Sequence, residues 1–495
     1  MTHVVSALIL LAATGAQAQR PVDRIAIESL ILAEDRRAAG PGDYELLAAA
    51  ASHRDALIRA RAVRALGRLE QRHPEGAAPA DLIARALGDA DAAVRRTAAY
   101  AIAQSVIARD AAAKAPRRAV LLARLADEKD DAVAGALMES AARLSDPASI
   151  AEVEAAVLAR ASTAGRAEAA ASALEILSRR AGKPGIVSAQ AIAWMRSTAI
   201  APVFALEARR AVMQALVTLR AVDAALATDV FGQDDWQLRR LAVLGSATAA
   251  EGLPIVEQAL RDADAHVRYE AVRATARRGA EGCAGVVAAA KDADAHVALA
   301  AIDALAGCAD PSVASMLAAL AASPGGVSWH RASHALVSLA ALDAARAREL
   351  LPAHAADRAW PVRMYAAQAA ARLGADQVLV TLAADAHPTV RESAVTGLVA
   401  RVKDPADPAA ARARLAEAVR AALAERRDPQ LLRTAAGAVA AAGDAPAFRD
   451  AILDAIEALD VAGGETTIDA RAALVRALPL AAPGSAPPPP PRPRA

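Results

Sequence analysis

The sequence predicts an all-α protein, an α-solenoid of stacked antiparallel helix pairs. A short phrase, Asp-x-x-Val/Leu-Arg-x-x-Ala-x-x-Ala, recurs along most of the chain. Its copies stand about thirty residues apart, which leaves room for two helices and two short turns. Apolar residues make up 55% of the 495 residues but aromatic residues only 2%. Alanine, the best helix former, therefore supplies most of the apolar content.

Residues 1–18 differ from the rest of the chain. The apolar run Val4–Ala13 is followed by small residues up to Ala18, as in a secretory signal cleaved before Gln19. Because no Lys or Arg precedes the run, a short N-terminal helix of a cytoplasmic protein is the alternative. We expect a periplasmic or secreted protein, and a cytoplasmic one if the segment is not cleaved. No later apolar run approaches the ~18 residues that cross a bilayer, so we expect no membrane span.

Residues 19–480 form the predicted solenoid, and the phrase explains its helices. Val267, Ala271 and Ala274 lie on one stripe of a helix that faces a packed neighbour. Asp264 precedes this helix and is predicted to cap it, while Arg268 can reach its own Asp or the Asp of the adjoining unit. We therefore expect caps and an Asp–Arg ladder along the seam. The predicted members are Asp55, Arg59, Asp91, Arg95, Asp235, Arg239, Asp264 and Arg268.

The Arg position of the phrase also marks the less regular units. It falls at Arg59, Arg95, Ala134, Arg239, Arg268, Ala298, Arg331, Arg363, Arg391 and Arg433. Where Ala replaces Arg the apolar spacing persists, so packing defines the unit. Residues 145–235 lack a clean copy until Asp235, although 167–177 and 208–219 have helical patterns.

Residues 481–495 end the pattern with five consecutive prolines, Pro487 to Pro491. Such a run favours the polyproline II conformation, so we expect a stiff, disordered tail that is either a tether or an unselected terminus.

The charge of the chain is balanced, with 57 basic residues against 56 acidic residues. A phosphate-binding surface needs clustered positive charge, and we find no long basic run. We therefore expect no nucleic-acid partner.

Cys283 and Cys308 are the only cysteines. Both are expected near the same end of one helix pair, so they form either a disulfide or two small buried apolar side chains.

Two histidine-containing patterns suggest metal ligands. Asp-Ala-Asp-Ala-His-Val occurs at 262–267 and again at 292–297, and His330 and His334 stand one helical turn apart. Stacked helices lie ~8–10 Å apart, which is too far for equivalent turns to share one ion. Duplicated turn chemistry is the better interpretation, and we expect no metal and no other cofactor.

Trp236, Trp329 and Trp360 fall at or just before the start of the phrase helices, so stacking brings them to one edge. Such a ridge could bind a partner, since Trp dominates binding hot spots, or the rings could serve as wedges between repeats. The sequence contains no glycine-rich phosphate loop, no Gly-x-Ser-x-Gly and no paired-cysteine motif. It therefore favours a protein without catalytic residues.

The phrase resembles bacterial HEAT repeats of the short type also found in phycobilin lyases, over roughly residues 40 to 440. This resemblance implies a HEAT solenoid. It leaves the function open, because that family includes scaffolds, inhibitors, lyases and a DNA glycosylase. The glycosylase alternative is disfavoured by the balanced charge and the expected export.

The segment Ile25 to Arg37 resembles the start of HEAT-repeat proteins that are fused to a cyclophilin-type peptidyl-prolyl isomerase. No isomerase motif occurs in this chain. Two hypotheses follow: an exported, non-catalytic scaffold that binds a protein or peptide on its concave face, or the HEAT-repeat portion of such an isomerase.

Overall fold

The computed structural model describes residues 24–36, 41–69, 79–105, 111–180, 187–247, 250–324, 329–403 and 407–481. The chain divides into two compact units, Met1–Ala221 and Val222–Ala495, and each is described by itself. Within the described residues the secondary structure consists of α-helices and short 3₁₀ turns, without β-strands. The predicted all-α class is confirmed.

The helices of the first unit are α1 (Arg24–Arg36), α2 (Pro41–Ala50), α3 (Ala56–Gly67), α4 (Pro79–Ala86), α5 (Ala92–Gln104), α6 (Ala111–Asp127), α7 (Asp131–Arg143), α8 (Ile150–Arg160), α9 (Ala167–Arg180), α10 (Ala189–Ile200) and α11 (Leu206–Thr218), with the 3₁₀ turn η2 (Ala164–Arg166).

The helices of the second unit are α12 (Ala224–Phe231), α13 (Trp236–Ser246), α14 (Leu253–Ala259), α15 (Ala265–Ala276), α16 (Cys283–Ala289), α17 (Ala295–Ala304), α18 (Pro311–Ala321), α19 (Trp329–Leu342), α20 (Ala344–Ala355), α21 (Trp360–Leu373), α22 (Asp376–Ala383), α23 (Pro388–Lys403), α24 (Pro408–Glu425), α25 (Pro429–Ala438), α26 (Arg449–Ala462) and α27 (Ile468–Ala477). Its 3₁₀ turns are η3 (Ala250–Gly252), η4 (Gly279–Gly282), η5 (Leu305–Gly307), η6 (Ala445–Phe448) and η7 (Glu465–Thr467).

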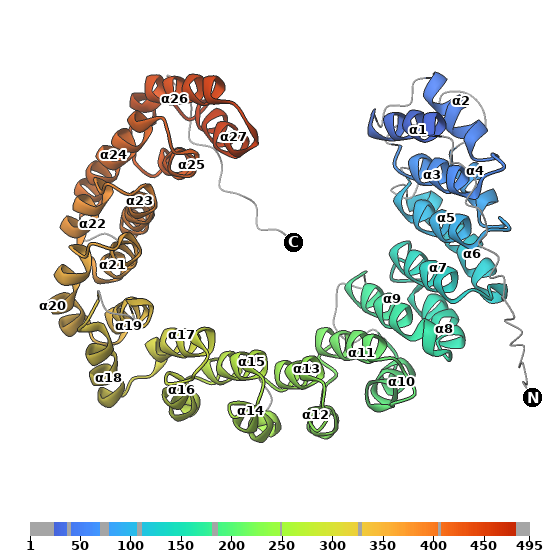
Figure 1. Cartoon of the computed structure of the whole chain (residues 1–495), viewed down its shortest axis with the longest axis horizontal. Coiled ribbons are helices and arrows are strands. Elements are labelled where there is room, and N and C mark those ends of the chain that lie inside the picture. Colours follow the sequence, from blue (N-terminus) through green and yellow to red (C-terminus); the bar gives the residue numbers. More distant parts are fainter. Residues whose placement is uncertain are drawn as a thin grey trace, which may run out of the picture. The chain divides into compact units, whose positions relative to one another are not determined.

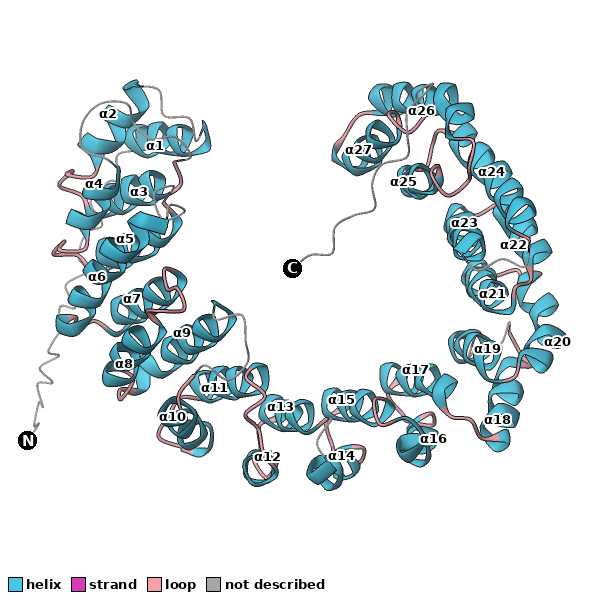
Figure 2. Ribbon diagram, turned by 180° about the vertical axis from the view of Figure 1, so that it is seen from behind, coloured by secondary structure: helices cyan, strands magenta, loops and turns pink. Residues whose placement is uncertain are grey.

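The helices of each unit form two layers. Odd-numbered helices lie side by side in one layer on the inner side of the unit's curve, and even-numbered helices form the other layer (Figure 1). The same arrangement is seen from behind in Figure 2. Successive odd-numbered helices pack directly on one another, whereas even-numbered helices contact mainly their odd-numbered neighbours. We call the odd-numbered layer the inner row.

Small residues allow the helices of the inner row to approach closely. A Cβ added to Gly67 on α3 would lie 2.6 Å from the Cβ of Ala101 on α5. A Cβ added to Gly135 on α7 would lie 2.8 Å from the Cβ of Ala169 on α9. Such gaps are too small for another carbon, because protein interiors are close-packed.

Helix register corrects two positions of the phrase. In α13 and α21 the Arg is the fourth helical residue, and the same count in α19 reaches Ala332 rather than Arg331. In α25 the cap Asp428 places Leu432, which is buried, at this position, and Arg433 is exposed. The irregular stretch 145–235 folds into helices α8 to α12. Its departure from the phrase therefore does not interrupt the pairing of helices.

Two predicted segments lie outside the described residues, namely the signal at 1–18 and the proline run of the tail at 481–495, of which only Ala481 is described. Among the helices that the structure does describe, none combines the length and the apolar character needed to span a membrane.

Candidate functional site

The four predicted capping residues lie at the N-termini of inner-row helices. The Asp55 carboxylate accepts a hydrogen bond from Leu57 N–H, and Asp91 accepts from Ala93 and Val94. Asp235 accepts from Leu238 N–H, and Asp264 from His266 N–H. Each carboxylate satisfies first-turn donors that have no partner within the helix.

The Arg of the phrase pairs with a different acid from the one that the sequence suggested. Arg59 binds Asp89 through two hydrogen bonds of 2.8 Å, and Arg268 binds Asp292 at 2.8 and 2.9 Å. The acceptor belongs to the next unit and stands two residues before that unit's cap. The capping Asp instead accepts from the first turn of its own helix. The ladder is therefore formed by Arg and a second acid, not by Arg and the cap.

The other two predicted ladder residues follow the same rule. Arg239 binds Asp262 at 2.7 and 2.9 Å, and Arg95 binds Glu128 with two bonds of 3.0 Å. Such two-pronged contacts are the geometry in which a guanidinium best matches a carboxylate.

Each ladder Arg also holds its own turn. Nη1 of Arg268 donates to the carbonyls of Asp262 and Ala263, and Nη1 of Arg95 donates to those of Asp89 and Ala90. One guanidinium thus connects the turn before its own helix with the turn of the next unit.

The pKa values of the ladder acids respond to these bonds. Hydrogen bonds from Arg59 lower the pKa of Asp89, and those from Arg268 lower the pKa of Asp292. Burial would raise the pKa of Glu128, but the bonds from Arg95, from a backbone N–H and from Arg124 outweigh burial and lower this pKa to about 2. The ladder acids are therefore ionised at neutral pH.

Where Ala replaces the ladder Arg, an arginine of the following unit donates hydrogen bonds to the carbonyls of that turn. Ala134 cannot hold the carbonyls of its turn, and Arg166 donates to Glu128 O at 3.3 Å and to Lys129 O at 3.2 Å instead. At Ala298 the corresponding donor is Arg331, 3.0 Å from Asp292 O. The sequence shows that Ala replaces Arg in the phrase, but it does not identify the substitute donor, which lies more than thirty residues away.

The three tryptophans begin α13, α19 and α21. The Trp236 ring stacks on His266 of α15 with ring centroids 4.6 Å apart, and the Trp360 ring stacks on His387 at 4.0 Å. Trp329 stacks on His330 of its own helix. Trp236 and Trp360 therefore bridge successive units, and 39% of Trp360 is exposed. The histidine partners were not predicted from the sequence.

The candidate metal ligands have other partners. His334 Nδ1 lies 2.7 Å from Asp303 Oδ1, and the His334 ring lies against Tyr365. Asp262 and Asp292 are the ladder acids, and Asp294 caps α17. Throughout the described ranges no three His, Cys, Asp or Glu side chains are grouped to hold a metal ion.

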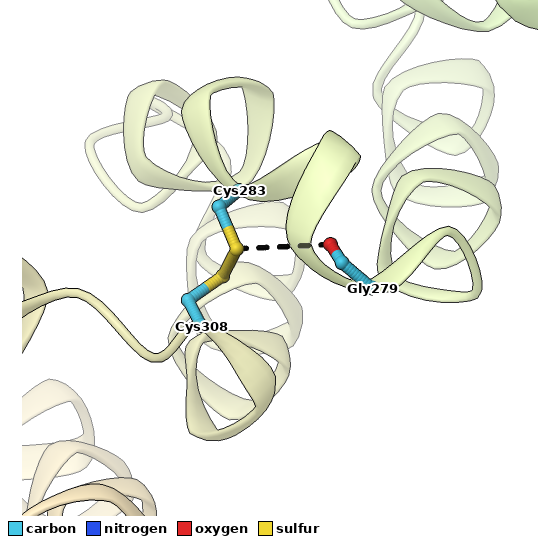
Figure 3. The surroundings of a disulfide bond; sticks show 3 residues. All are labelled: Gly279, Cys283 and Cys308. Carbon is cyan, nitrogen blue, oxygen red and sulfur yellow. Dashed lines mark hydrogen bonds between the residues drawn. A yellow bond between two sulfur atoms is a disulfide. The ribbon is translucent and has the colours of Figure 1, made fainter.

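Cys283 and Cys308 form a disulfide between the start of α16 and the end of η5, with Cα atoms 5.7 Å apart (Figure 3). Cys283 Sγ also lies 3.7 Å from Gly279 O. The bond closes one helix pair at a single end and connects no other unit.

The inner row of the second unit contains a cavity of about 490 Å³ between α21 and α23. The exposed surface of its lining is mainly apolar, and polar groups are contributed by Gln368, Arg372, Thr389, Glu392, Ser393 and Thr396. Glu392 accepts hydrogen bonds from Gln430 at 2.8 Å and Thr434 at 3.0 Å, which fixes its carboxylate. A mainly apolar lining with a few placed polar groups is typical of a binding site.

No family model matches this chain, and no curated protein matches it. Several solved structures, in contrast, match the chain. A crystal structure of importin β matches with a TM-score of 0.54 at 17% identity, covering 92% of this chain and 72% of that chain. The fold is a HEAT-repeat α-solenoid.

Two structures of Kap95p match with similar scores. Kap95p in a structure with RanGDP has a TM-score of 0.56 at 13% identity, covering 90% of this chain and 67% of that chain. Yeast importin β (Kap95p) gives 0.55 at 12% identity, with 92% and 68% covered. At these identities the likeness concerns the fold.

Proposed function

We propose that this chain is a non-catalytic HEAT-repeat scaffold that binds a protein or peptide along its inner row. The observation that carries the proposal is the row itself. Within the described residues of each unit, the odd-numbered helices pack on one another and on the even-numbered layer, and the inner row of the second unit has the cavity between α21 and α23. Stacked repeats characteristically use such extended surfaces for binding.

The comparisons support this proposal at the level of the fold. HEAT-repeat solenoids are typical protein-binding scaffolds, and the solved structures include Kap95p with RanGDP and Kap95p with Nup1. For this chain a protein partner is therefore the first class to test.

Export is the second part of the proposal. The apolar run Val4–Ala13 with its small-residue ending fits a secretory signal. A disulfide between Cys283 and Cys308 fits an oxidising compartment, since such bonds are rare in the cytosol. Fractionation of cells that express the tagged chain tests this part, and recovery in the cytoplasm with free thiols would contradict it.

Site-specific photocross-linking tests the scaffold. A benzoylphenylalanine placed at Gln368 faces the cavity, and one at Gln258 on α14 lies in the even-numbered layer as a matched control. Both glutamines are exposed. We expect a discrete adduct in native cells from position 368 only. Equal adducts from both positions would refute binding along the inner row.

The tryptophan edge has its own test. Trp236→Ala and Trp360→Ala should lower the yield of the cross-linked adduct from position 368 and leave helical content unchanged, as expected if the tryptophans bind the partner. Loss of helical content by circular dichroism would show instead that the rings are wedges between units.

The isomerase hypothesis remains the alternative. It rests on the resemblance of the first helix alone, and the described residues add no observation in its favour. A proline isomerisation assay on the purified chain separates the two, because clear activity would rule out a non-catalytic scaffold.

A further inference from the structure

A second cavity, of about 380 Å³, opens on the inner row of the first unit between α3 and α5. Its lining consists of Arg64, Arg96, Thr97, Tyr100, Ala101 and Gln104. Two guanidinium groups thus share a small cavity with further polar groups.

The positive charge beside this cavity exceeds the negative charge that faces it. Glu34 on α1 is buried, with 4% of its side chain exposed, and three arginines of α3 surround it. Arg61 and Arg64 lie 3.0 Å from its carboxylate, and Arg68 lies 2.6 Å away. One carboxylate balances one of these three charges. Of the three, Arg64 lines the cavity, and about half of its side chain is exposed.

Arg96 on α5 adds a further exposed charge at the opposite wall. Glu139 on α7 places negative charge beside Tyr100 and lies 3.7 Å from Arg143 of its own helix. Burial and the neighbouring Glu139 raise the pKa of Tyr100, so its ring lines the cavity as a neutral phenol. The cavity therefore remains positively charged at neutral pH.

We propose that this cavity binds the carboxylates of an acidic peptide segment in a protein partner. The inference rests on the proposed scaffold function and names the chemistry of one of its contacts. Guanidinium groups recognise carboxylates through two parallel hydrogen bonds, and a partly enclosed site is screened less by salt than an open surface.

The extent of the charge favours a short acidic segment over a nucleic acid. Further along the inner row of this unit, Arg143 pairs with Glu139 and Arg179 pairs with Glu175, each within one helix. A long polyanion would need unpaired charge along its whole path. On α7 and α9 these two arginines therefore have an acid partner, whereas Arg64 and Arg96 line the cavity between α3 and α5.

Fluorescence anisotropy with the full chain tests the proposal. The probe is a labelled octapeptide of glutamate and glycine, and a glutamine–glycine peptide of equal length is its control. We expect saturable binding of the acidic peptide only. Arg96→Gln should weaken it ~10-fold, because one charge-assisted contact is lost. Arg96 has no role in holding Glu34, so circular dichroism should show an unchanged fold.

Arg179→Gln is the matched control, because it removes the same charge from the same row at a site that already has an acid partner. It should change the affinity less than two-fold. Equal losses of affinity in both variants would mean that net charge alone explains the effect, and this result would overturn the proposal. Absence of binding, or tighter binding of a single-stranded oligonucleotide than of the peptide, would overturn it as well. The cross-link at Gln368 in the second unit is independent of this outcome, so failure of the cavity and failure of the scaffold are distinguishable.

Discussion

Glu128 gives the sharpest test of the ladder, because one carboxylate there serves two arginines. It accepts hydrogen bonds from Arg95 at 3.0 Å, from Arg124 at 2.8 Å, and from the backbone N–H groups of Lys129 and Asp130 at 3.0 Å. Only 1% of its side chain is exposed. Glu128→Gln keeps the shape of the side chain and removes its charge.

The expected loss follows from the pKa of Glu128. Its pKa falls from an ordinary value of 4.5 to about 2 in the folded protein. At ~1.4 kcal/mol per unit, this shift corresponds to about 3 kcal/mol of stabilisation at neutral pH. Since the unfolded chain takes up the proton first as pH falls, the stabilisation is complete above pH 4.5. It is lost progressively as pH falls towards 2, and less than half remains at pH 3.

Hydrogen exchange by mass spectrometry is the appropriate assay, because repeat proteins open locally and global unfolding need not be two-state. Glu128→Gln should lower the opening free energy of amides in α5 to α7 by about 3 kcal/mol at pH 7, and by less than half of that at pH 3. Glu152→Gln is the control, since 60% of that side chain is exposed and the same change there should cost under ~0.5 kcal/mol. A Glu128 effect no larger than the Glu152 effect, or one that does not shrink with acid, would refute the ladder as a source of stability.

Three further changes test other parts of the fold. Reducing the Cys283–Cys308 bond should lower the opening free energy around α16 and α17 by ~3 kcal/mol, measured by hydrogen exchange with and without dithiothreitol; a double Ser variant that still responds to reductant would contradict this. His354 is fully buried, and burial lowers its pKa below 6.5, so its region should lose stability as pH falls below 6.5; His354→Gln should flatten that dependence in exchange measurements. Gly67→Ala should lower the opening free energy by ~1–3 kcal/mol in hydrogen exchange because it forces α3 and α5 apart, whereas Gly88→Ala, whose nearest neighbour would be 3.5 Å away, should cost little.

Local chemistry explains what the sequence could predict. Caps at Asp55 and Asp264 depend on residues within one turn, and the helices depend on apolar spacing, so both can be read without knowing the neighbours. The partner of Arg268 depends on the register between units, which a single phrase does not contain. The signal was nonetheless present. The Asp-Ala-Asp of residues 262–264 carries two acids, of which capping explains only one.

The candidate surfaces were harder to predict for the same reason. Trp360 could be placed at an edge from its position in the helix, but its stacking on His387 requires two units to be aligned. To predict the cavity between α3 and α5, three helices must be aligned: α1 with Glu34, α3 with its arginines, and α5 with Arg96. In the sequence these arginines look like ordinary solvated charge, and only packing reveals that they outnumber the acid they surround.

Arg95 and Arg96 show how one helix separates stability from binding. Arg95 has 12% of its side chain exposed and is bonded to Glu128, so its charge is used within the ladder. The next residue along α5, Arg96, points to the cavity and remains exposed. Adjacent residues on a helix face directions ~100° apart, so identical side chains reach different surroundings. Loss of Arg95 should therefore loosen the first unit, whereas loss of Arg96 should leave its stability unchanged and weaken only the acidic ligand. Substitutions at the ladder positions should therefore change the stability of the fold. Partner specificity should be sought at the residues that follow the ladder positions along each helix.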